Sequence, residues 1–371
     1  MMPSVVSVAI IGGGPAGATA ALLLARGGVD VALFERSSGP RFERGEVLAP
    51  EGRSALSQIG LWERRPSDAM APCNSMRIAW RASMPAERSA ITNPYGCGWH
   101  IKRKLFDDWL VAEAAREGAR IARPASVSKI VHNGAGWQID LDAGGERRVF
   151  ATVVVDACGR SGRWRWPAAT RTRHDALCTV VAVGDRIESA SELLIEAVPD
   201  GWCYSVAAGD CEALVGFVTD ADILVGAGGG RAAFSRALEA APLTARRIRA
   251  LAGDVVTTSA CTTSLQPAAA NGWIAVGDAA LAHEPLAGQG ILFALRSATR
   301  AAFAVRSHLD GDARALASYA SEMRGHVAEY ARNRRDVYGA QGRWRGELFW
   351  KRRTVSSGPG HMEGSISNGS F

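Results

Sequence analysis

One stretch near the N-terminus, Val5 to Glu35, constrains the fold of this chain more than any other part of the sequence. It begins with a β-branched apolar run of the kind that forms a buried parallel strand. Three glycines in the spacing G-x-G-x-x-G follow this run. An Ala- and Leu-rich helical stretch and a second short apolar run come next. This order of strand, glycine turn, helix and strand predicts the β-α-β unit of a Rossmann-type α/β domain.

The glycines and the acid that closes this stretch are spaced for a dinucleotide. Gly12 can make the tight turn, Gly14 lets the backbone approach a pyrophosphate, and Gly17 lets the helix pack close to the strand. Glu35 stands 18 residues past Gly17, roughly the spacing at which an acid accepts hydrogen bonds from the adenosine ribose. We therefore predict cofactor contacts at the turn, at the start of the helix and at the acid with its neighbour: Gly12, Gly14, Pro15, Ala16, Gly17, Glu35 and Arg36.

The composition is that of a globular chain with more than one domain. The 371 residues are many for a single core, and 47% apolar with 22% charged residues is ordinary usage. The sequence has no apolar run long enough to span a membrane and no signal-peptide pattern, so we expect a cytoplasmic protein with no membrane partner. Seven cysteines without C-x-x-C pairs indicate neither a disulfide framework nor a zinc site, and we predict no metal.

The net charge of +6 comes mainly from arginine, much of it in the last third of the chain. No nucleic-acid recognition motif accompanies this charge, so we expect no nucleic-acid partner. The positive charge could instead attract an anionic cofactor or an acidic substrate. Eight arginines could form a basic surface that steers an acidic partner, or could simply solvate helices: Arg324, Arg332, Arg334, Arg335, Arg343, Arg345, Arg352 and Arg353.

Two further motifs follow apolar strands later in the chain. The first is Asp156-x-x-Gly159-Arg160. The second begins with Gly277-Asp278 and continues through a proline and a G-x-G run into a long helix, whose N-terminus offers backbone amides.

Together the three motifs resemble those of the FAD-dependent monooxygenases of the para-hydroxybenzoate hydroxylase type and of the related flavin-dependent halogenases, over nearly the whole chain. The resemblance implies that the Gly-Asp aspartate binds the ribityl chain of FAD, that the glycine loop lies against the isoalloxazine, and that an arginine opening an amphipathic helix meets the diphosphate. The contacts predicted in this way are Arg103, Asp156, Gly159, Gly277, Asp278, Pro285, Gly288, Gln289, Gly290 and Ile291.

The resemblance also implies the architecture. We expect a Rossmann-type, glutathione reductase-like FAD-binding domain, an inserted and mostly antiparallel β-sheet substrate domain, and a C-terminal helical region. The expected boundaries are 1–75, 99–174 and 255–310 for the FAD-binding domain, 76–98 and 175–254 for the substrate domain, 311–354 for the helices, and 355–371 for a disordered tail.

Finer features are similar to the halogenase-like flavoproteins that mature tryptophylquinone cofactors. They are the runs Asp200–Ser205, Phe217–Asp222 and Arg343–Arg353. This likeness implies an FAD-dependent monooxygenase that uses O2 and a flavin C4a-hydroperoxide to hydroxylate an aromatic group, expected to be an indole. The substrate would be a small molecule or a tryptophan in a partner polypeptide. Electrons would come from NAD(P)H directly or through a separate flavin reductase.

Three alternatives stay open: a flavin-dependent halogenase, an FAD-dependent reductase or dehydrogenase of a natural-product pathway, and a flavin-binding scaffold without activity. The sequence departs from the halogenase pattern in two places. Trp202 is followed by Cys203 and Tyr204 in place of a second tryptophan with Ile-Pro, and Arg77 lies where the halogenase lysine is expected.

No Ser-His-Asp or metal cluster offers a different chemistry. His283 and Glu284 lie in the loop beside the predicted isoalloxazine site, so each is a candidate general base or polar orienter. His100 is a further candidate.

Overall fold

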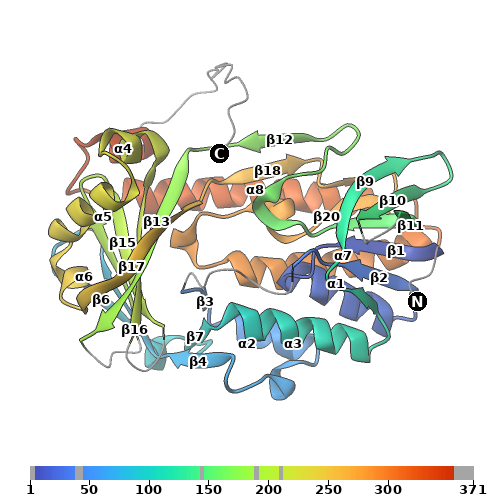
Figure 1. Cartoon of the computed structure of the whole chain (residues 1–371), viewed down its shortest axis with the longest axis horizontal. Coiled ribbons are helices and arrows are strands. Elements are labelled where there is room, and N and C mark those ends of the chain that lie inside the picture. Colours follow the sequence, from blue (N-terminus) through green and yellow to red (C-terminus); the bar gives the residue numbers. More distant parts are fainter. Residues whose placement is uncertain (1–4, 38–44, 143–145, 188–191, 209–211, 355–371) are drawn as a thin grey trace.

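The computed structural model describes residues 5–37, 45–142, 146–187, 192–208 and 212–354. Two large β-sheets lie at opposite ends of the long axis, and long helices run between them (Figure 1). No described helix is both long and apolar enough to cross a membrane.

The first sheet has eight strands, and its central strand is the one predicted before the glycine turn. That strand pairs in parallel with the strands on both sides of it, and it is buried over most of its length. Apolar residues on both faces explain why these strands read as continuous apolar runs. The strands are β1 (Val5–Ile11), β2 (Val31–Phe34), β8 (Arg120–Ala122), β9 (Ser126–His132), β10 (Trp137–Asp142), β11 (Glu146–Asp156), β19 (Ala269–Ala270) and β20 (Trp273–Ala275).

The second sheet has seven strands in the order β17-β13-β16-β15-β14-β5-β6. All neighbours are antiparallel except β14 and β5, which pair in parallel. The strands are β5 (Ser75–Ala79), β6 (Ala86–Ser89), β13 (Leu177–Arg186), β14 (Leu193–Val198), β15 (Gly201–Ala207), β16 (Glu212–Asp220) and β17 (Ile248–Ser259).

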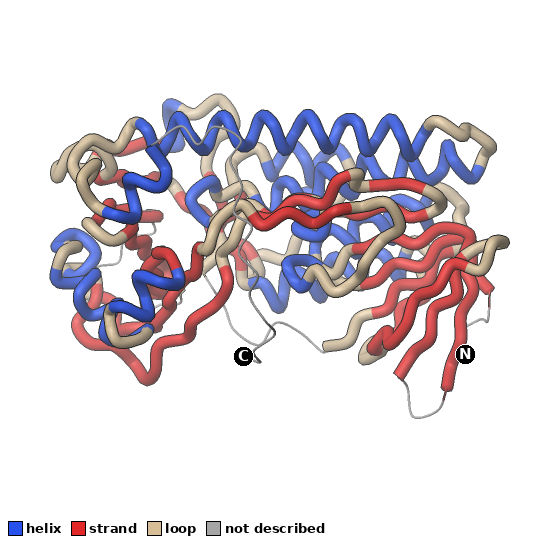
Figure 2. Tube along the Cα trace, turned by 90° about the horizontal axis from the view of Figure 1, so that it is seen from above, coloured by secondary structure: helices blue, strands red, loops and turns tan. Residues whose placement is uncertain are grey.

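The helices gather on one side of the first sheet and on the outer side of the second (Figures 1 and 2). They are α1 (Pro15–Arg26), α2 (Gly52–Gln58), α3 (Arg103–Arg116), α4 (Ala221–Gly226), α5 (Gly230–Glu239), α6 (Pro242–Ala245), α7 (Gly290–Leu309), α8 (Ala315–Gly339) and α9 (Leu348–Thr354). Two small sheets complete the fold, made of β3 (Val47–Leu48), β4 (Met70–Cys73) and β7 (Gly98–Ile101), and of β12 (Thr170–Arg173), β18 (Thr263–Gln266) and β21 (Leu281–Ala282).

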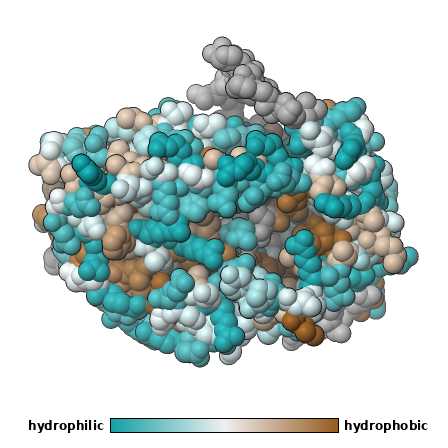
Figure 3. All heavy atoms as spheres, turned by 180° about the vertical axis from the view of Figure 1, so that it is seen from behind, coloured by the Kyte–Doolittle hydropathy of each residue, from teal (hydrophilic) through white to brown (hydrophobic). Residues whose placement is uncertain are grey.

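Three apolar cores hold these layers together. The largest surrounds the first sheet, and a smaller one lies between the second sheet and α5 and α6. The third packs Trp202 of the second sheet against Tyr338 of α8 and Trp350 of α9. One face of the surface is mostly hydrophilic, with hydrophobic residues only in small patches (Figure 3).

The predicted α/β architecture, with an antiparallel second sheet and C-terminal helices, is confirmed. The strands of the second sheet come from residues 75–89 and 177–259. The division into a cofactor domain and a substrate domain remains our proposal. The predicted tail, 355–371, lies outside the described residues.

Candidate active site

The glycine turn between β1 and α1 needs two of its glycines for packing. A Cβ on Gly12 would lie 2.3 Å from the carbonyl oxygen of Ala157, and the backbone there has a positive φ of 111°. A Cβ on Gly17 would lie 1.9 Å from the carbonyl oxygen of Gly12. At Gly14, however, an added Cβ would meet nothing within 4 Å. The turn is therefore closed toward the sheet and open at the N-terminus of α1, the geometry that a bound pyrophosphate requires.

Glu35 extends from the end of β2 to this turn. Its Oε2 accepts a hydrogen bond from the backbone N–H of Gly13 at 2.6 Å, and its Oε1 accepts one from Ser37 at 2.8 Å. These bonds fix the carboxylate beside the turn, in the place expected for a ribose contact. Its neighbour Arg36 is exposed.

A cavity of about 330 Å³ opens from the N-terminus of α1 toward the second sheet. One side consists of Gly45, Glu46 and Val47, and the opposite side consists of the segment 283–291. Two positions on this second side, Gly288 and Gly290, carry no side chain, and an added Cβ there would meet nothing within 4 Å. This leaves space for a flat ring system against the backbone at these two positions.

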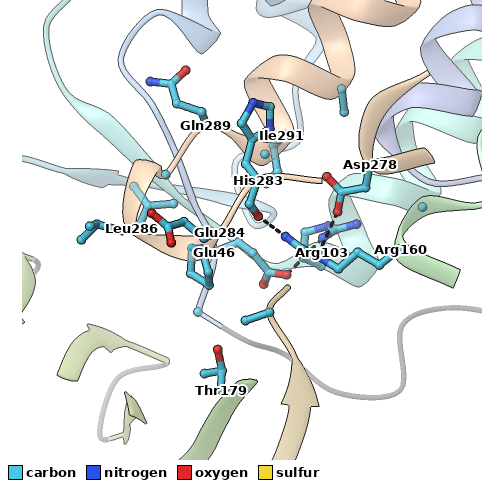
Figure 4. Close-up of a pocket in the computed structure, with 18 of the residues that line it drawn as sticks. Glu46, Arg103, Arg160, Thr179, Asp278, His283, Glu284, Leu286, Gln289 and Ile291 are labelled. Carbon is cyan, nitrogen blue, oxygen red and sulfur yellow. Dashed lines mark hydrogen bonds and ion pairs between the residues drawn. The ribbon is translucent and has the colours of Figure 1, made fainter. Parts of the chain in front are cut away.

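Arg160 ties together three segments around the cavity (Figure 4). Its guanidinium donates to the carbonyl oxygen of Cys261 at 2.7 Å and to that of His283, and it pairs with the carboxylate of Asp278 at 3.1 Å. The Asp278 side chain is 27% exposed and lines the cavity, so it remains accessible to a ligand.

Arg103 lies at the first residue of α3 and lines the same cavity. It pairs with Glu46 at 3.1 Å and with Asp107 at 2.9 Å. Burial favours its neutral form, but these two carboxylates prevail and raise its pKa above the ordinary arginine value. The arginine is thus held as a cation at the cavity wall.

His283 and Glu284 are adjacent in sequence but face different surroundings. The His283 ring packs edge-on against Phe293 and Tyr330, at centroid distances of 4.6 and 4.5 Å. Burial, with the nearby Arg160 guanidinium, lowers the pKa of His283 to about 3, so the ring is neutral at pH 7. In Figure 4 the imidazole and the Glu284 side chain point in different directions.

Glu284 is buried, with 4% of its surface exposed. Its Oε2 accepts from Arg334 Nε at 3.1 Å and from the Tyr338 hydroxyl at 3.0 Å. Burial raises the pKa of Glu284, which the Arg334 guanidinium opposes.

Most predicted site residues line this cavity, but some do not. Those that line it are Gly14, Pro15, Ala16, Arg103, Gly159, Asp278, His283, Glu284, Pro285, Gly288, Gln289, Gly290 and Ile291. Those that do not are Gly12, Gly17, Glu35, Arg36, His100, Asp156 and Gly277. The Asp156 carboxylate is buried and accepts from Trp166 Nε1 at 2.7 Å and from the backbone N–H of Cys158 at 3.1 Å, one layer behind the wall. His100 lies in β7, in the small sheet with β3 and β4.

The cavity residues that the second sheet contributes were not predicted from the sequence. These residues, the sheet wall, alternate along three strands and so share one face: Thr179 and Val181 on β13, Leu193 and Ile195 on β14, Trp202 and Tyr204 on β15. This period-two pattern was visible in the sequence, but the choice between the two faces of the sheet was not. Glu46, which pairs with Arg103, was also missed.

Three of the eight C-terminal arginines form ion pairs within the protein. Arg334 pairs with Glu284 and with Asp175, both at 3.1 Å. Arg353 is only 5% exposed, and both it and Arg352 pair with Asp220. These cations pair with the largely buried carboxylates of Glu284, Asp175 and Asp220 and tie α8 and α9 to the rest of the fold, whereas the side chain of Arg352 stays 39% exposed.

A second cavity, of about 420 Å³, lies between α7 and α8. It shares His283, Glu284, Leu286 and Gln289 with the first, so this segment forms the wall between them. Among the described residues, no group of His, Cys, Asp and Glu side chains could hold a metal ion.

Known proteins match this chain over most of its length. A family model described as an FAD binding domain matches residues 5–195. The putative FAD-dependent oxidoreductase LodB of Marinomonas mediterranea is 26% identical, over 95% of this chain and 98% of that protein. The tryptophan 2-halogenase of Chondromyces crocatus is 25% identical, over 89% of this chain and 67% of that enzyme.

Solved structures are similar throughout the fold. The chondrochloren halogenase CndH superposes with a TM-score of 0.87 at 23% identity, over 95% of this chain and 86% of that one. The peptidyl tryptophan dihydroxylase QhpG superposes with a TM-score of 0.79 at 25% identity, over 98% and 81%. The predictions of the superfamily and of FAD as cofactor are confirmed, and the open space at Gly14, Gly288 and Gly290 fits this cofactor. The chain belongs to the FAD binding domain family and is an FAD-dependent oxidoreductase.

Proposed function

We propose that this enzyme is a monooxygenase that hydroxylates an aromatic side chain, a tryptophan within a partner polypeptide. FAD, when bound, supplies the redox chemistry that activates O2. Asp278, Arg103 and the backbone of 285–291 hold and orient it. The sheet wall positions the ring of the substrate against it and excludes water. A general base within the cavity, for which Glu284 is the candidate, completes the site.

The positions of the lysines favour oxygenation over halogenation. A halogenase delivers its oxidised halogen through a lysine between flavin and substrate, and this chain has only four lysines: Lys102, Lys104, Lys129 and Lys351. All four are exposed, and none lines the cavity. At the position expected for that lysine, Arg77 pairs with Glu192 at 3.1 Å. The amine that halogenation needs is thus missing from the site.

One solved structure supports the polypeptide substrate. QhpG carries the description peptidyl tryptophan dihydroxylase essential for tryptophylquinone cofactor biogenesis, and this chain spans 81% of it. The match to LodB, which spans 98% of that protein, supports an FAD-dependent oxidoreductase. The sheet wall, with Val181, Leu193 and Ile195, is apolar enough to receive an indole.

Mass spectrometry of candidate polypeptides tests this function. The holoenzyme is incubated with O2 and with tryptophan-containing products of neighbouring genes. Electrons come from NAD(P)H in one series and from a separate flavin reductase with NAD(P)H in another. We expect tryptophan to gain one or two oxygen atoms, at a yield that does not change with chloride or bromide. A product that carries halogen would instead establish a halogenase, and reduction of a double bond without O2 would establish a reductase.

A further inference from the structure

The two oxygens of the Glu284 carboxylate have unequal surroundings. The side-chain hydrogen bonds from Arg334 and from Tyr338 both go to Oε2. Oε1 accepts no bond from the described residues and keeps some accessible surface. Glu284 lies in the wall between the two cavities, so a ligand can approach Oε1 from the first of them. An acceptor oxygen that is fixed by its neighbours and accessible from a cavity can receive a donor from a ligand.

The same carboxylate lies at the end of the sheet wall. The Tyr338 hydroxyl, which donates to Glu284, accepts in turn from Trp202 Nε1 at 3.2 Å. Trp202 lines the cavity from β15, beside Tyr204 and two strands from Met76 on β5. A ring that rests on the sheet wall thus has its edge within reach of Glu284.

The neighbours of this carboxylate hold it in place. The Arg334 guanidinium and the Tyr338 hydroxyl both donate to Oε2, and the cation of Arg334 opposes the rise in the pKa of Glu284 that burial causes. Arg334 is itself fixed by a second pair with Asp175 at 3.1 Å. The position of Oε1 is therefore set by the fold and does not depend on the substrate.

We propose that Glu284 orients the substrate by accepting a hydrogen bond on Oε1 from a ring N–H, while the ring lies on the sheet wall. This inference rests on the proposed function and states how the indole of its substrate is recognised. Such an acceptor discriminates strongly against a ring without a donor, because binding that ring leaves a desolvated carboxylate unpaired.

Two small probes measure this discrimination without the partner polypeptide. N-acetyltryptophanamide is the first, and its benzothiophene analogue, in which sulfur replaces the ring N–H, is the second. Dissociation constants are measured on the FAD-loaded enzyme from changes in flavin absorbance. We expect the sulfur analogue to bind roughly 10- to 100-fold more weakly, the value of one hydrogen bond to a charged group.

Two variants separate this role from a structural one. Glu284→Gln keeps the shape but removes the charge, so the ratio of the two dissociation constants should fall to a few-fold. Tyr338→Phe is the matched control, because it removes a bond to Oε2 and leaves Oε1. It should shift both dissociation constants together and keep their ratio.

Each outcome decides one point. Equal affinity of the unaltered enzyme for the two probes would overturn the role of Glu284, even if the Gln variant failed to fold. The same conclusion holds if Glu284→Gln keeps the full ratio, or if Tyr338→Phe loses it. A holoenzyme that binds neither probe and oxidises no tryptophan polypeptide contradicts the proposed function itself, which makes the two failures distinguishable.

Discussion

At the scale of single residues, a substitution of Glu35 tests how much this carboxylate contributes to FAD affinity. Its carboxylate is already fixed beside Gly13 by a hydrogen bond of 2.6 Å. Glu35→Ala removes one or two charge-assisted hydrogen bonds to the ribose, and we expect FAD binding to weaken by about 1.5–3 kcal/mol for each. Calorimetric titration of the FAD-free protein with FAD measures this change. Asp30→Ala, at the other end of the same strand and on the surface, is the control and should bind FAD normally.

The lowered pKa of His283 predicts that the stability of the protein depends on pH. Its pKa falls from 6.5 to about 3 on folding, so between these values the unfolded chain binds a proton that the folded chain does not. Stability conferred by this group is therefore full above pH 6.5 and is lost as the pH falls toward 3, by up to about 1.4 kcal/mol per pH unit. In urea unfolding at pH 7, 6 and 5, His283→Gln should lose less stability on acidification than the unaltered protein. Parallel losses in both proteins would contradict the assignment.

Sequence reasoning at this scale succeeds where a residue type is the only one possible. At Gly12 and Gly17 a Cβ would collide with backbone atoms, so only glycine fits and the motif could be recognised in the sequence. The orientation of His283 is not, because its ring is directed by Phe293 and Tyr330, which lie 10 and 47 residues further along the chain. The hydrogen bond from Trp166 to Asp156 could not be predicted either, because an aspartate after a strand can bind a ligand or can accept from a side chain of the protein.

At the scale of elements, two glycines in the turn from β1 into α1 have different roles, one in stability and one in FAD binding. Gly17→Ala places a Cβ 1.9 Å from backbone, so we expect a loss of about 3 kcal/mol or more of stability, with or without FAD. Gly14→Ala meets nothing within 4 Å, and its φ of −71° is ordinary. Without FAD its melting temperature should be unchanged, while FAD affinity falls roughly tenfold or more, because the methyl group occupies pyrophosphate space. Thermal melts with and without FAD measure both effects.

Many elements were predictable from local patterns, but the order of the strands within the sheets was not. The helix α7 follows the glycine loop, and the hairpin between β9 and β10 follows from Asn133-Gly134. The parallel pairing of β14 with β5 joins residues that lie more than 100 positions apart, and no local signal specifies it. That pairing brings Met76 to the cavity.

At the scale of the whole molecule, α9 locks the C-terminal region onto the second sheet. Trp350 is fully buried, packs on Trp80 at 5.1 Å, and donates from Nε1 to the carbonyl oxygen of Val198 at 2.9 Å. Trp350→Ala should cost about 3–5 kcal/mol of stability, as other large core truncations do. Chemical unfolding measures this cost. Leu348→Ala, at a position that is 51% exposed in the same helix, should change little, and an equal loss there would argue against the packing role.

The parallel order of the first sheet has a consequence for the synthesis of this protein on the ribosome. β1 emerges first, but its neighbour β11 ends at Asp156, and the loop that faces the cofactor ends near residue 290. A nascent chain therefore cannot assemble the FAD site until it has been translated to about residue 290. Cofactor capture is thus a late event in its biogenesis, and a ribosome stalled before residue 270 should display a chain that retains no flavin.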